Sequence, residues 1–326
     1  MSLRIGLIGA GGIAREHLSA WRSLGVEVSV FSHAGAAGLI AELGGTEVAT
    51  LSELLGCADV VDIATPTPTH GDLALAALHA GLPVVCEKPL ARTAAEAERV
   101  IEAFEAADLP LYPGHVVRYF SEYAAARAAV SAGAIGEVAV QRFTRTGSAP
   151  TAAWFHDDAQ SGGIVLDQCL HDLDFARWTA GEVATAYAQE SMAGGVRSVQ
   201  VLLAHRSGAL SNVCGTWARP GTRFRTTFDI AGTGGVLTHD SAEHPLLQTD
   251  FGDQPVAGTG RGLLPAMAYE SPFQTELGEF LAALRGGPLP RVGARDGLAA
   301  IRIAEAAQCS LVSGQAEPVA GTEVAR

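Results

Sequence analysis

The sequence contains no run of basic residues, and charged residues of either sign are sparse. Lys and Arg number 22 against 35 Asp and Glu in 326 residues, so the formal net charge is −13. Nucleic acids and anionic membranes bind surfaces of opposite charge, so neither is expected as a partner. A negative net charge is still compatible with a local pocket that binds a phosphate group.

Cysteine pairs and long apolar runs are absent as well. The cysteines are single and form no C-x-x-C pair, which argues against a disulfide framework and a structural zinc site. They are Cys57, Cys86, Cys169, Cys214 and Cys309. No stretch reaches the roughly 18 apolar residues needed to span a bilayer, and the first apolar run breaks into glycines instead of forming a signal peptide. We expect a soluble, cytoplasmic protein.

The order of strand and helix patterns predicts two domains in a chain too long for one core. Up to about residue 120, apolar strand-like runs alternate with helical stretches, which indicates a parallel sheet covered on both faces. Later strand-like runs follow one another with glycine turns, which favours a mostly antiparallel sheet with flanking helices. The expected fold class is α/β plus α+β: a Rossmann dinucleotide-binding domain over 1–120 and a substrate-binding and oligomerisation domain over 121–326. Later helices are expected at about 167–180, 273–284 and 294–311.

A glycine-rich turn lies directly after the first strand-like run. Gly9, Gly11 and Gly12, with Ile13 and Ala14, form a G-x-G-x-x-A element that opens the first helix. In dinucleotide-binding folds the first glycine allows the turn, the second lets the pyrophosphate approach the backbone, and the helix N-terminus faces the phosphates. Glycine turns are often structural, but this position in a strand–helix series favours a cofactor site.

An acidic residue is missing about twenty positions further on. Sites for NAD normally place Asp or Glu at the end of the second strand, where it holds the ribose hydroxyls. Here the strand ends in Ser32 and His33. A carboxylate would repel a 2′-phosphate, whereas Ser32 can donate a hydrogen bond to it and His33 can carry a positive charge. We therefore expect NADP, or use of both NADP and NAD, unless these residues merely begin a loop.

Two further strand ends carry residues that a buried strand does not need. Thr65 and Pro66 begin the stretch TPTPTH, which ends at His70, and Glu87 and Lys88 follow the run VVC. Ligands of open parallel sheets bind outside the carboxyl ends of the strands. Lys88 is thus expected beside the nicotinamide, although a charged strand end at the surface is the simpler alternative.

Together these stretches resemble the family of glucose–fructose oxidoreductase, inositol dehydrogenase and the rhizopine-catabolism oxidoreductases. The matching elements are GAGGIA at 9–14, T-P-x-x-x-H at 65–70, EKP at 87–89, VRYF at 117–120 and GGIVLDQCLHDLDFARWTAG at 162–181. The last is similar to the family's G-G-x-x-x-D-x-x-x-H-x-x-D helix. Its residues resemble the inositol dehydrogenase branch of the family.

The resemblance implies a catalytic trio of Lys88, Asp167 and His171. It also implies that the cofactor is lined by Thr65, Pro66, His70 and Glu87. Two positions depart from the family, because Cys169 stands where glycine is frequent and His115 where asparagine is common. Both departures affect the expected sugar pocket.

The chemistry of the trio supports the same roles on independent grounds. Asp167 and His171 lie four residues apart on the expected helix, so they share a face with Cβ atoms about 6 Å apart. The carboxylate raises the basicity of the imidazole and orients it, which suits proton transfer from a secondary alcohol. Lys88 can hydrogen-bond the same oxygen and stabilise alkoxide charge. The alternatives are a helix cap for Asp167 and a buried structural histidine for His171; no third ligand has convincing spacing, so no metal is expected.

Three more residues are candidates for the substrate pocket: His115, Arg118 and Trp154. A role in domain packing is equally open for Arg118. Trp154 belongs to an aromatic loop that would either stack on a sugar ring or anchor itself.

These features predict an NAD(P)-dependent oxidoreductase that transfers a hydride between nicotinamide and a secondary alcohol or ketone of a cyclic polyol, sugar or sugar derivative. An alternative enzyme would cleave a glycosidic bond through transient oxidation, and a non-catalytic alternative is a ligand-sensing regulator. We also expect a homodimer or homotetramer, because the second sheet needs cover on both faces and few helices are available for it.

Overall fold

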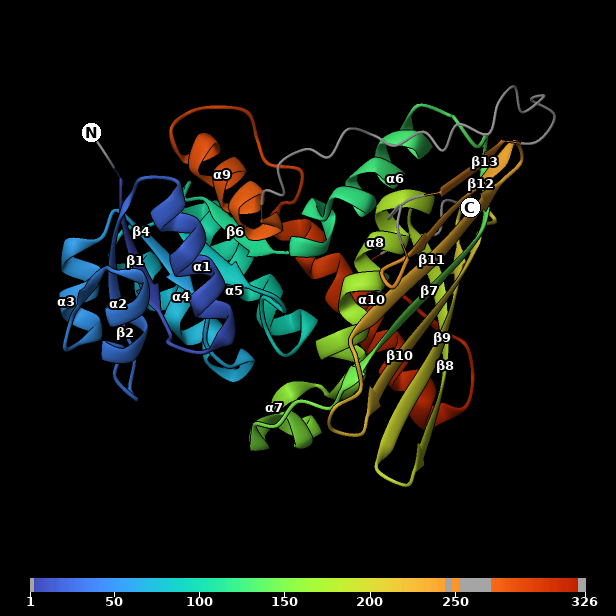
Figure 1. Cartoon of the computed structure of the whole chain (residues 1–326), viewed down its shortest axis with the longest axis horizontal. Coiled ribbons are helices and arrows are strands. Elements are labelled where there is room, and N and C mark those ends of the chain that lie inside the picture. Colours follow the sequence, from blue (N-terminus) through green and yellow to red (C-terminus); the bar gives the residue numbers. More distant parts are fainter. Residues whose placement is uncertain (1–2, 244–247, 252–270, 322–326) are drawn as a thin grey trace. The chain divides into compact units, whose positions relative to one another are not determined.

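In the computed structural model, the described residues are 3–243, 248–251 and 271–321. They form two compact units, each with its own sheet (Figure 1). The first unit comprises Met1–Tyr119 and Glu270–Leu298, and the second comprises Phe120–Tyr269 and Ala299–Arg326. The chain leaves the first unit near residue 120 and contributes a later segment to it again.

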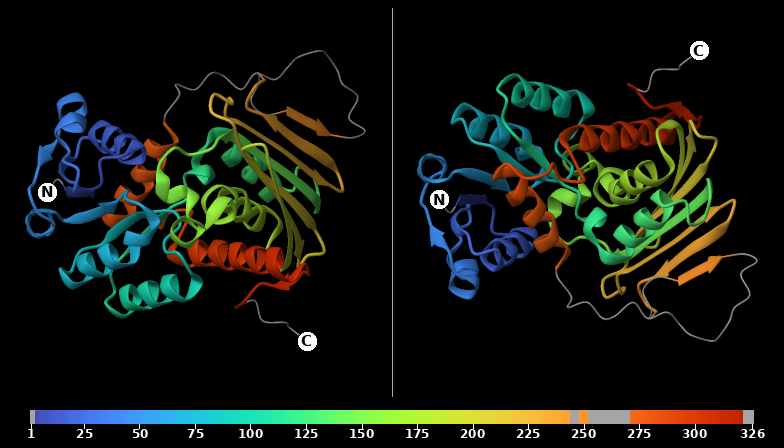
Figure 2. Two further views of the ribbon diagram at one scale, coloured as in Figure 1. Left: turned by 90° about the horizontal axis from the view of Figure 1, so that it is seen from below. Right: turned by 90° about the horizontal axis from the view of Figure 1, so that it is seen from above.

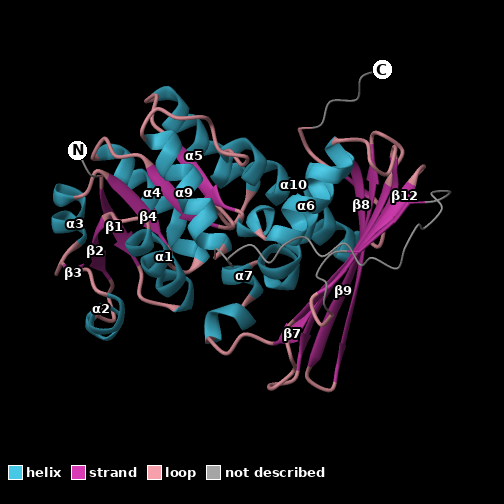
Figure 3. Cartoon of the chain, turned by 45° about the horizontal axis from the view of Figure 1, so that its top comes forward, coloured by secondary structure: helices cyan, strands magenta, loops and turns pink. Residues whose placement is uncertain are grey.

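The first unit is built on six parallel strands in the order β3-β2-β1-β4-β5-β6. The strands are β1 (Arg4–Ile8), β2 (Glu27–Phe31), β3 (Thr46–Glu47), β4 (Val60–Ile63), β5 (Val84–Glu87) and β6 (Leu111–Gly114). Helices alternate with them along the chain (Figure 3): α1 (Gly12–Ser23), α2 (Ala37–Leu43), α3 (Leu51–Cys57), α4 (His70–His79) and α5 (Ala94–Ala106). The strand order reverses between β1 and β4, which is where open sheets of this kind bind ligands.

Helix α9 (Pro272–Leu284) returns to the first unit because its apolar side chains complete that unit's core. Leu277, Phe280 and Leu281 are buried in one cluster with Ile5 and Leu7 of β1. Periodicity predicts a helix here but not the sheet that it covers. Strand β3 and helix α3 were not expected either, and β3 has only two residues, which is too short for a clear pattern.

The second unit holds an eight-stranded sheet in the order β13-β12-β11-β7-β10-β9-β8-β14. Among the described strands of this sheet only β7 and β10 pair in parallel, so the prediction of a mostly antiparallel sheet is confirmed. The strands are β7 (Val138–Ser148), β8 (Val183–Ala193), β9 (Val196–His205), β10 (Leu210–Ala218), β11 (Arg225–Gly232), β12 (Gly235–Asp240), β13 (Gln248–Phe251) and β14 (Glu317–Pro318).

Three helices lie along one face of this sheet (Figure 2): α6 (Ser121–Ser131), α8 (Leu170–Ala180) and α10 (Ala294–Ser313). Alternate strand residues point into the layer between them, so Phe143 and Phe228 pack edge-on or tilted against Phe175 of α8. The Ala188 amide of β8 donates a 2.9 Å hydrogen bond to Ser310 of α10. No helix in the described part of the chain is long and apolar enough to cross a membrane.

Candidate active site

The glycine turn between β1 and α1 leaves room for close approach of a phosphate. Gly9 has a φ of 123°, and a Cβ there would lie 2.3 Å from the carbonyl oxygen of Ala64, so only glycine fits. Gly11 and Gly12 are exposed, and a Cβ on either would meet no atom within 4 Å. Ile13 beside them is 43% exposed. Open space in front of a helix N-terminus without a side-chain cap fits a dinucleotide pyrophosphate.

The end of β2 carries no carboxylate of its own, but a neighbouring strand supplies one nearby. Ser32 is half-buried, while His33 is exposed and packs against Phe31 with ring centroids 5.3 Å apart. Glu47 of β3 accepts a 2.7 Å hydrogen bond from the Ala36 amide, which ties its carboxylate to the loop backbone. Sequence reasoning missed this glutamate because it comes from the next strand rather than from the end of β2.

His70 braces two of the predicted strand ends against each other. Its Nδ1 lies 2.8 Å from the carbonyl oxygen of Pro89, and its Nε2 lies 2.8 Å from that of Thr65. The side chain is buried, and this burial lowers the pKa of His70. Thr65 is half-buried and Pro66 is exposed. A cofactor therefore has access to Thr65 and Pro66, whereas His70 shapes the loop from inside.

Lys88 follows β5 directly, and its side chain is half-buried. The peptide bond to Pro89 is cis, and the Lys88 amide donates a 3.0 Å hydrogen bond to Oε2 of the buried Glu87. Burial by itself raises the pKa of Glu87, but His17 and the charge of Lys88 lower it below its ordinary value, so the group is ionised. Glu87 is thus held in the interior of the first unit, and the cofactor contact that the resemblance implies for it stays a prediction.

A buried ionic cluster continues inward from this turn. His17 of α1 is fully buried, with Nδ1 2.9 Å from Oδ2 of Asp62 and Nε2 3.2 Å from Oε1 of Glu87. Trp21 donates a 2.6 Å hydrogen bond from Nε1 to Asp62. Burial by itself lowers the pKa of His17, but the two carboxylates reverse this and raise it well above 6.5. Sequence reasoning missed the cluster, although an Asp within the apolar strand VVDI of β4 was a signal for it.

Glu276 of α9 brings a third carboxyl to the cluster. It is fully buried, and neither carboxyl oxygen has a hydrogen-bond partner among the described residues. Burial, reinforced by the negative charge of Glu87, raises the pKa of Glu276 well above 4.5. The carboxyl therefore keeps its proton to a higher pH than an exposed glutamate does, which limits buried negative charge beside Asp62 and Glu87.

Replacing Glu276 with Gln should raise the midpoint of thermal unfolding at neutral pH, by an amount that grows with pH. In the unfolded chain the carboxyl loses its proton above about pH 4.5, while the folded chain keeps it up to its higher folded pKa. The stability of the native protein therefore falls by up to about 1.4 kcal/mol per pH unit across that window, and the glutamine variant escapes this loss. Unfolding of both proteins between about pH 5 and pH 8 measures the difference.

Glu279→Gln is a matched control on the same helix. Glu279 is half-exposed and pairs with Arg291, so loss of its charge should lower the unfolding midpoint instead of raising it. A gain in Glu276→Gln that stays constant with pH, or a loss like that of the control, would contradict the raised pKa of Glu276.

His115 and Arg118 lie inside the first unit, each only 1% exposed. Arg118 donates from Nη1 to the carbonyl oxygen of Arg291 at 2.8 Å and to Asp296 at 3.3 Å. His115 packs against Gly297, where a Cβ would lie 3.5 Å from Nε2. These contacts favour the packing role for Arg118, and the substrate contacts expected of both residues stay predictions.

Asp167 and His171 lie in the second unit on a helix that is not uniform. Val165–Cys169 forms a π-helical turn, and α8 continues from Leu170, where the sequence predicts a single α-helix. Asp167 is inside the π turn, whose N-cap is Ile164, so it does not cap the helix. Both side chains are half-buried, which suits groups that meet a ligand.

The π turn has a tertiary cause. Gln168 donates a 2.6 Å hydrogen bond from Nε2 to the carbonyl oxygen of Arg145 in β7. Cys169 fills the space beside Gly215 of β10, where a Cβ would lie 2.4 Å from its Sγ. The sheet thus holds this turn from two neighbouring strands, and such π turns occur frequently at functional sites.

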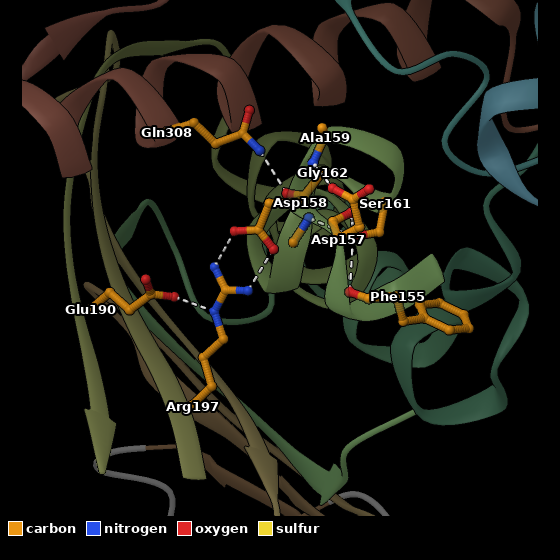
Figure 4. Close-up of polar contacts among 10 residues, drawn as sticks. Phe155, Asp157, Asp158, Ala159, Ser161, Gly162, Glu190, Arg197 and Gln308 are labelled. Atoms are coloured by element: carbon orange, nitrogen blue, oxygen red, sulfur yellow. Dashed lines mark hydrogen bonds and ion pairs between the residues drawn. The ribbon is translucent and has the colours of Figure 1, made fainter. Parts of the chain in front are cut away.

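The chain just before this helix is tied to the sheet and to α10 (Figure 4). Arg197 of β9 donates from both Nη atoms to the two carboxylate oxygens of Asp158, each at 2.6 Å. Gln308 of α10 donates a 2.6 Å hydrogen bond to the carbonyl oxygen of Gly162. Sequence reasoning missed these contacts, which fix the turn that leads to Asp167.

Trp154 stacks on Phe155 in the same loop, with ring centroids 3.8 Å apart and planes 29° apart. Both rings are half-exposed. The pair anchors the loop and still presents an aromatic face to solvent, so sugar stacking by Trp154 stays a prediction.

The charged residue on the next turn belongs to the core. Asp172 is buried and accepts hydrogen bonds of 2.9 and 2.8 Å from Nε and Nη2 of Arg145. Within the described residues, no group of three or more His, Cys, Asp or Glu side chains is placed to hold a metal ion. The predicted trio is divided between the units, with Lys88 in the first and both Asp167 and His171 in the second.

Profiles of known protein families match both units. The oxidoreductase family with an NAD-binding Rossmann fold matches residues 3–115. The GFO/IDH/MocA C-terminal domain matches residues 123–238. The two matches meet close to the point where the chain passes from the first unit to the second.

Individual relatives and solved structures extend the similarity over most of the chain. A myo-inositol 2-dehydrogenase of Thermotoga maritima is 31% identical over 263 residues, which is 78% of this chain and 77% of the relative. The rhizopine catabolism protein MocA of Rhizobium meliloti is 30% identical and covers 93% of both chains. A levoglucosan dehydrogenase solved with NADH and L-sorbose shares the fold with a TM-score of 0.87 at 23% identity, over 98% of this chain and 99% of that chain. The chain belongs to the GFO/IDH/MocA family of oxidoreductases.

Proposed function

We propose that this protein is an NAD(P)-dependent dehydrogenase or reductase that acts on a secondary alcohol or ketone of a cyclic polyol, sugar or sugar derivative. The observation that carries the proposal is the open glycine turn after β1, at the same sheet edge as Lys88 after β5. Family membership supports the reaction class. Relatives named as inositol, apiose and anhydrofructose enzymes support the substrate class.

Each residue of the trio has a distinct task in this proposal. When bound, the nicotinamide ring supplies or accepts the hydride. His171 exchanges the proton of the substrate hydroxyl, and Asp167 orients the imidazole and stabilises its protonated form. Lys88 hydrogen-bonds the same oxygen and stabilises its developing negative charge. The proposal requires that the two units present these groups to one substrate.

The two alternative functions have less support. Relatives named as dehydrogenases and reductases favour net redox chemistry over glycoside cleavage. The presence of Lys88, Asp167 and His171 together argues against a regulator that only senses a ligand, because such a protein does not need a proton acceptor.

A substrate screen tests the proposal directly. Purified protein is mixed with NAD or NADP and a panel of inositols, sugars and sugar acids, and the nicotinamide absorbance band is followed. We expect steady reduction of cofactor with at least one polyol or sugar. Cleavage of a glycoside without net absorbance change, or cofactor binding without turnover across the panel, would contradict the proposal.

The cofactor preference depends on Ser32 and His33 in this proposal, and we expect NADP or dual use. Ser32→Asp should lower the ratio of NADP to NAD affinity by about tenfold or more, which corresponds to about 1.4 kcal/mol. The introduced carboxylate repels the 2′-phosphate and holds the ribose hydroxyls of NAD. Fluorescence titration with both reduced cofactors measures the ratio.

Ser23→Asp is the control for this experiment, because it adds the same charge at the exposed last residue of α1. We expect it to leave the cofactor ratio unchanged. Strong selectivity for NAD in the unmodified protein, or an unchanged ratio in Ser32→Asp, would show that the end of β2 does not select NADP.

We further propose assembly into a homodimer or homotetramer through the second sheet. In the described structure the helices of the second unit lie on one face (Figure 2). Leu202 and Leu210, in the outward-facing positions of β9 and β10, are 42% and 44% exposed, and burial against another copy would remove this apolar surface from water.

A further inference from the structure

We infer that His17 is a positioning residue for Lys88, because it bridges Asp62 and Glu87 and thereby fixes the turn from which the lysine side chain projects. The inference deepens the proposed function and rests on the role given there to Lys88. In this role His17 contacts neither the glycine turn nor the substrate. It acts on Lys88 only through Glu87.

Two hydrogen bonds through Glu87 connect the ring of His17 to the backbone of Lys88. Glu87 uses both carboxylate oxygens, since Oε1 lies 3.2 Å from Nε2 of His17 and Oε2 accepts the Lys88 amide at 3.0 Å. On its other side His17 places Nδ1 3.0 and 2.9 Å from the two oxygens of Asp62. A carboxylate held at both oxygens has one orientation, so the backbone of Lys88 follows the position of His17.

The bridge also connects the lysine turn with the cofactor turn. His17 is on α1, the helix that begins at Gly12. Five residues of α-helix separate the two, which is about 7.5 Å along the axis. Asp62 is on β4, next to both β1 and β5 in the sheet. The same helix therefore carries the open N-terminus expected to face the pyrophosphate and the side chain that holds the turn of Lys88.

The charges of the cluster require a histidine that is protonated on both nitrogens. Asp62 and Glu87 offer only acceptors, so each ring nitrogen must donate. Trp21 gives Asp62 one further donor at 2.6 Å, and Phe273 of α9 packs on the imidazole with ring centroids 5.7 Å apart. Loss of the imidazolium would leave buried carboxylates without compensation. A glutamine at position 17 can donate toward only one side, so it separates the two halves of the bridge.

A double-mutant cycle with kcat as the readout tests the inference. His17→Gln should lower kcat by about 10- to 100-fold in the presence of Lys88, because a misplaced catalytic group loses orientation. The KM for the cofactor should change by less than about twofold, since the glycine turn is intact. In a Lys88→Met background the same His17→Gln change should have almost no further effect on kcat.

A second readout does not depend on turnover. Lys88 is the only lysine in the chain, so protein labelled with ¹⁵N-lysine has a single lysine amide signal. That amide is the donor to Oε2 of Glu87. In His17→Gln we expect its hydrogen exchange with solvent to accelerate by about tenfold or more, because the acceptor is no longer held in place.

Trp21→Phe is the matched control within the same cluster. It removes the other donor to Asp62 and reduces core packing, so it should lower the unfolding midpoint. The bridge from His17 to Glu87 is retained, and we expect both kcat and the exchange of the Lys88 amide to stay near their original values. A merely structural His17 would make the two variants alike, with lower stability and unchanged kcat.

The outcomes separate this inference from the proposed function. If Lys88→Met alone keeps full turnover, the proposed role of Lys88 fails and the inference fails with it. If Lys88→Met is impaired while His17→Gln acts equally in both backgrounds, or leaves amide exchange unchanged, only the inference is overturned. Should His17→Gln not fold, Glu87→Gln breaks the same bridge at its other end and is expected to show the same coupling with Lys88.

Discussion

His171→Ala is expected to lower kcat by roughly 10²–10⁴-fold on the true substrate, because it removes the group that exchanges the hydroxyl proton. Cofactor affinity should be unchanged, since His171 belongs to the second unit and the glycine turn to the first. The side chain is half-buried at the start of α8, so the truncation should leave the fold intact. Steady-state turnover and fluorescence titration of nicotinamide on one preparation measure both quantities.

His205→Gln is the appropriate control for this variant. His205 is also in the second unit, and its two ring nitrogens lie 2.7 Å from the carbonyl oxygen of Gly181 and from the Ser211 hydroxyl. We expect this change to lower stability and to leave kcat near its original value. Near-normal turnover in His171→Ala would rule out a proton-transfer role and leave the histidine a structural residue.

Lys88→Ala is expected to lower kcat by roughly 10²–10³-fold and to raise the KM of the substrate much less. The ammonium interacts mainly with negative charge that develops on the reacting oxygen, and such an interaction is stronger in the transition state than in the ground state. Full kinetic curves at saturating cofactor separate the two constants.

Arg295→Ala serves as the charge-matched control in the first unit. Arg295 is an exposed cation that pairs with Glu105, so its loss removes one positive charge without affecting a strand end. We expect unchanged kinetics in this variant. Equal kcat in Lys88→Ala and the parent protein would mean that the lysine is an ordinary surface charge at the end of β5.

Local sequence patterns determined the parts of the protein that depend on short stretches of chain. Gly9 is required by its own turn, since its φ of 123° is a conformation that residues with a side chain rarely adopt. Strands β1 and β2 end where the sequence predicts, directly before the glycine turn at Gly9 and before Ser32, because short apolar runs next to glycines or polar residues give a clear strand signal. The family followed from motifs of this kind, spaced along the whole chain.

Only the tertiary structure decided which of these residues face inward. His70 and Glu87 belong to motifs expected to line the cofactor, yet both are buried, and their partners are backbone carbonyls for His70 and His17 for Glu87. Arg118 likewise pairs inside the first unit with Asp296, 178 positions further along the chain. A motif identifies a place in the fold, but the direction of a side chain depends on partners far away in the sequence.

The ionic cluster and the π turn also depend on partners far away in the sequence, and no local pattern predicts them. His17, Asp62, Glu87 and Glu276 come from four separate elements, and no local pattern joins α1 to a helix more than 250 residues later. The π turn at Val165–Cys169 exists because β7 and β10 hold Gln168 and Cys169. Buried charges need partners in the packed core, and those partners come from distant segments. The cluster and the π turn therefore form only when these segments pack together.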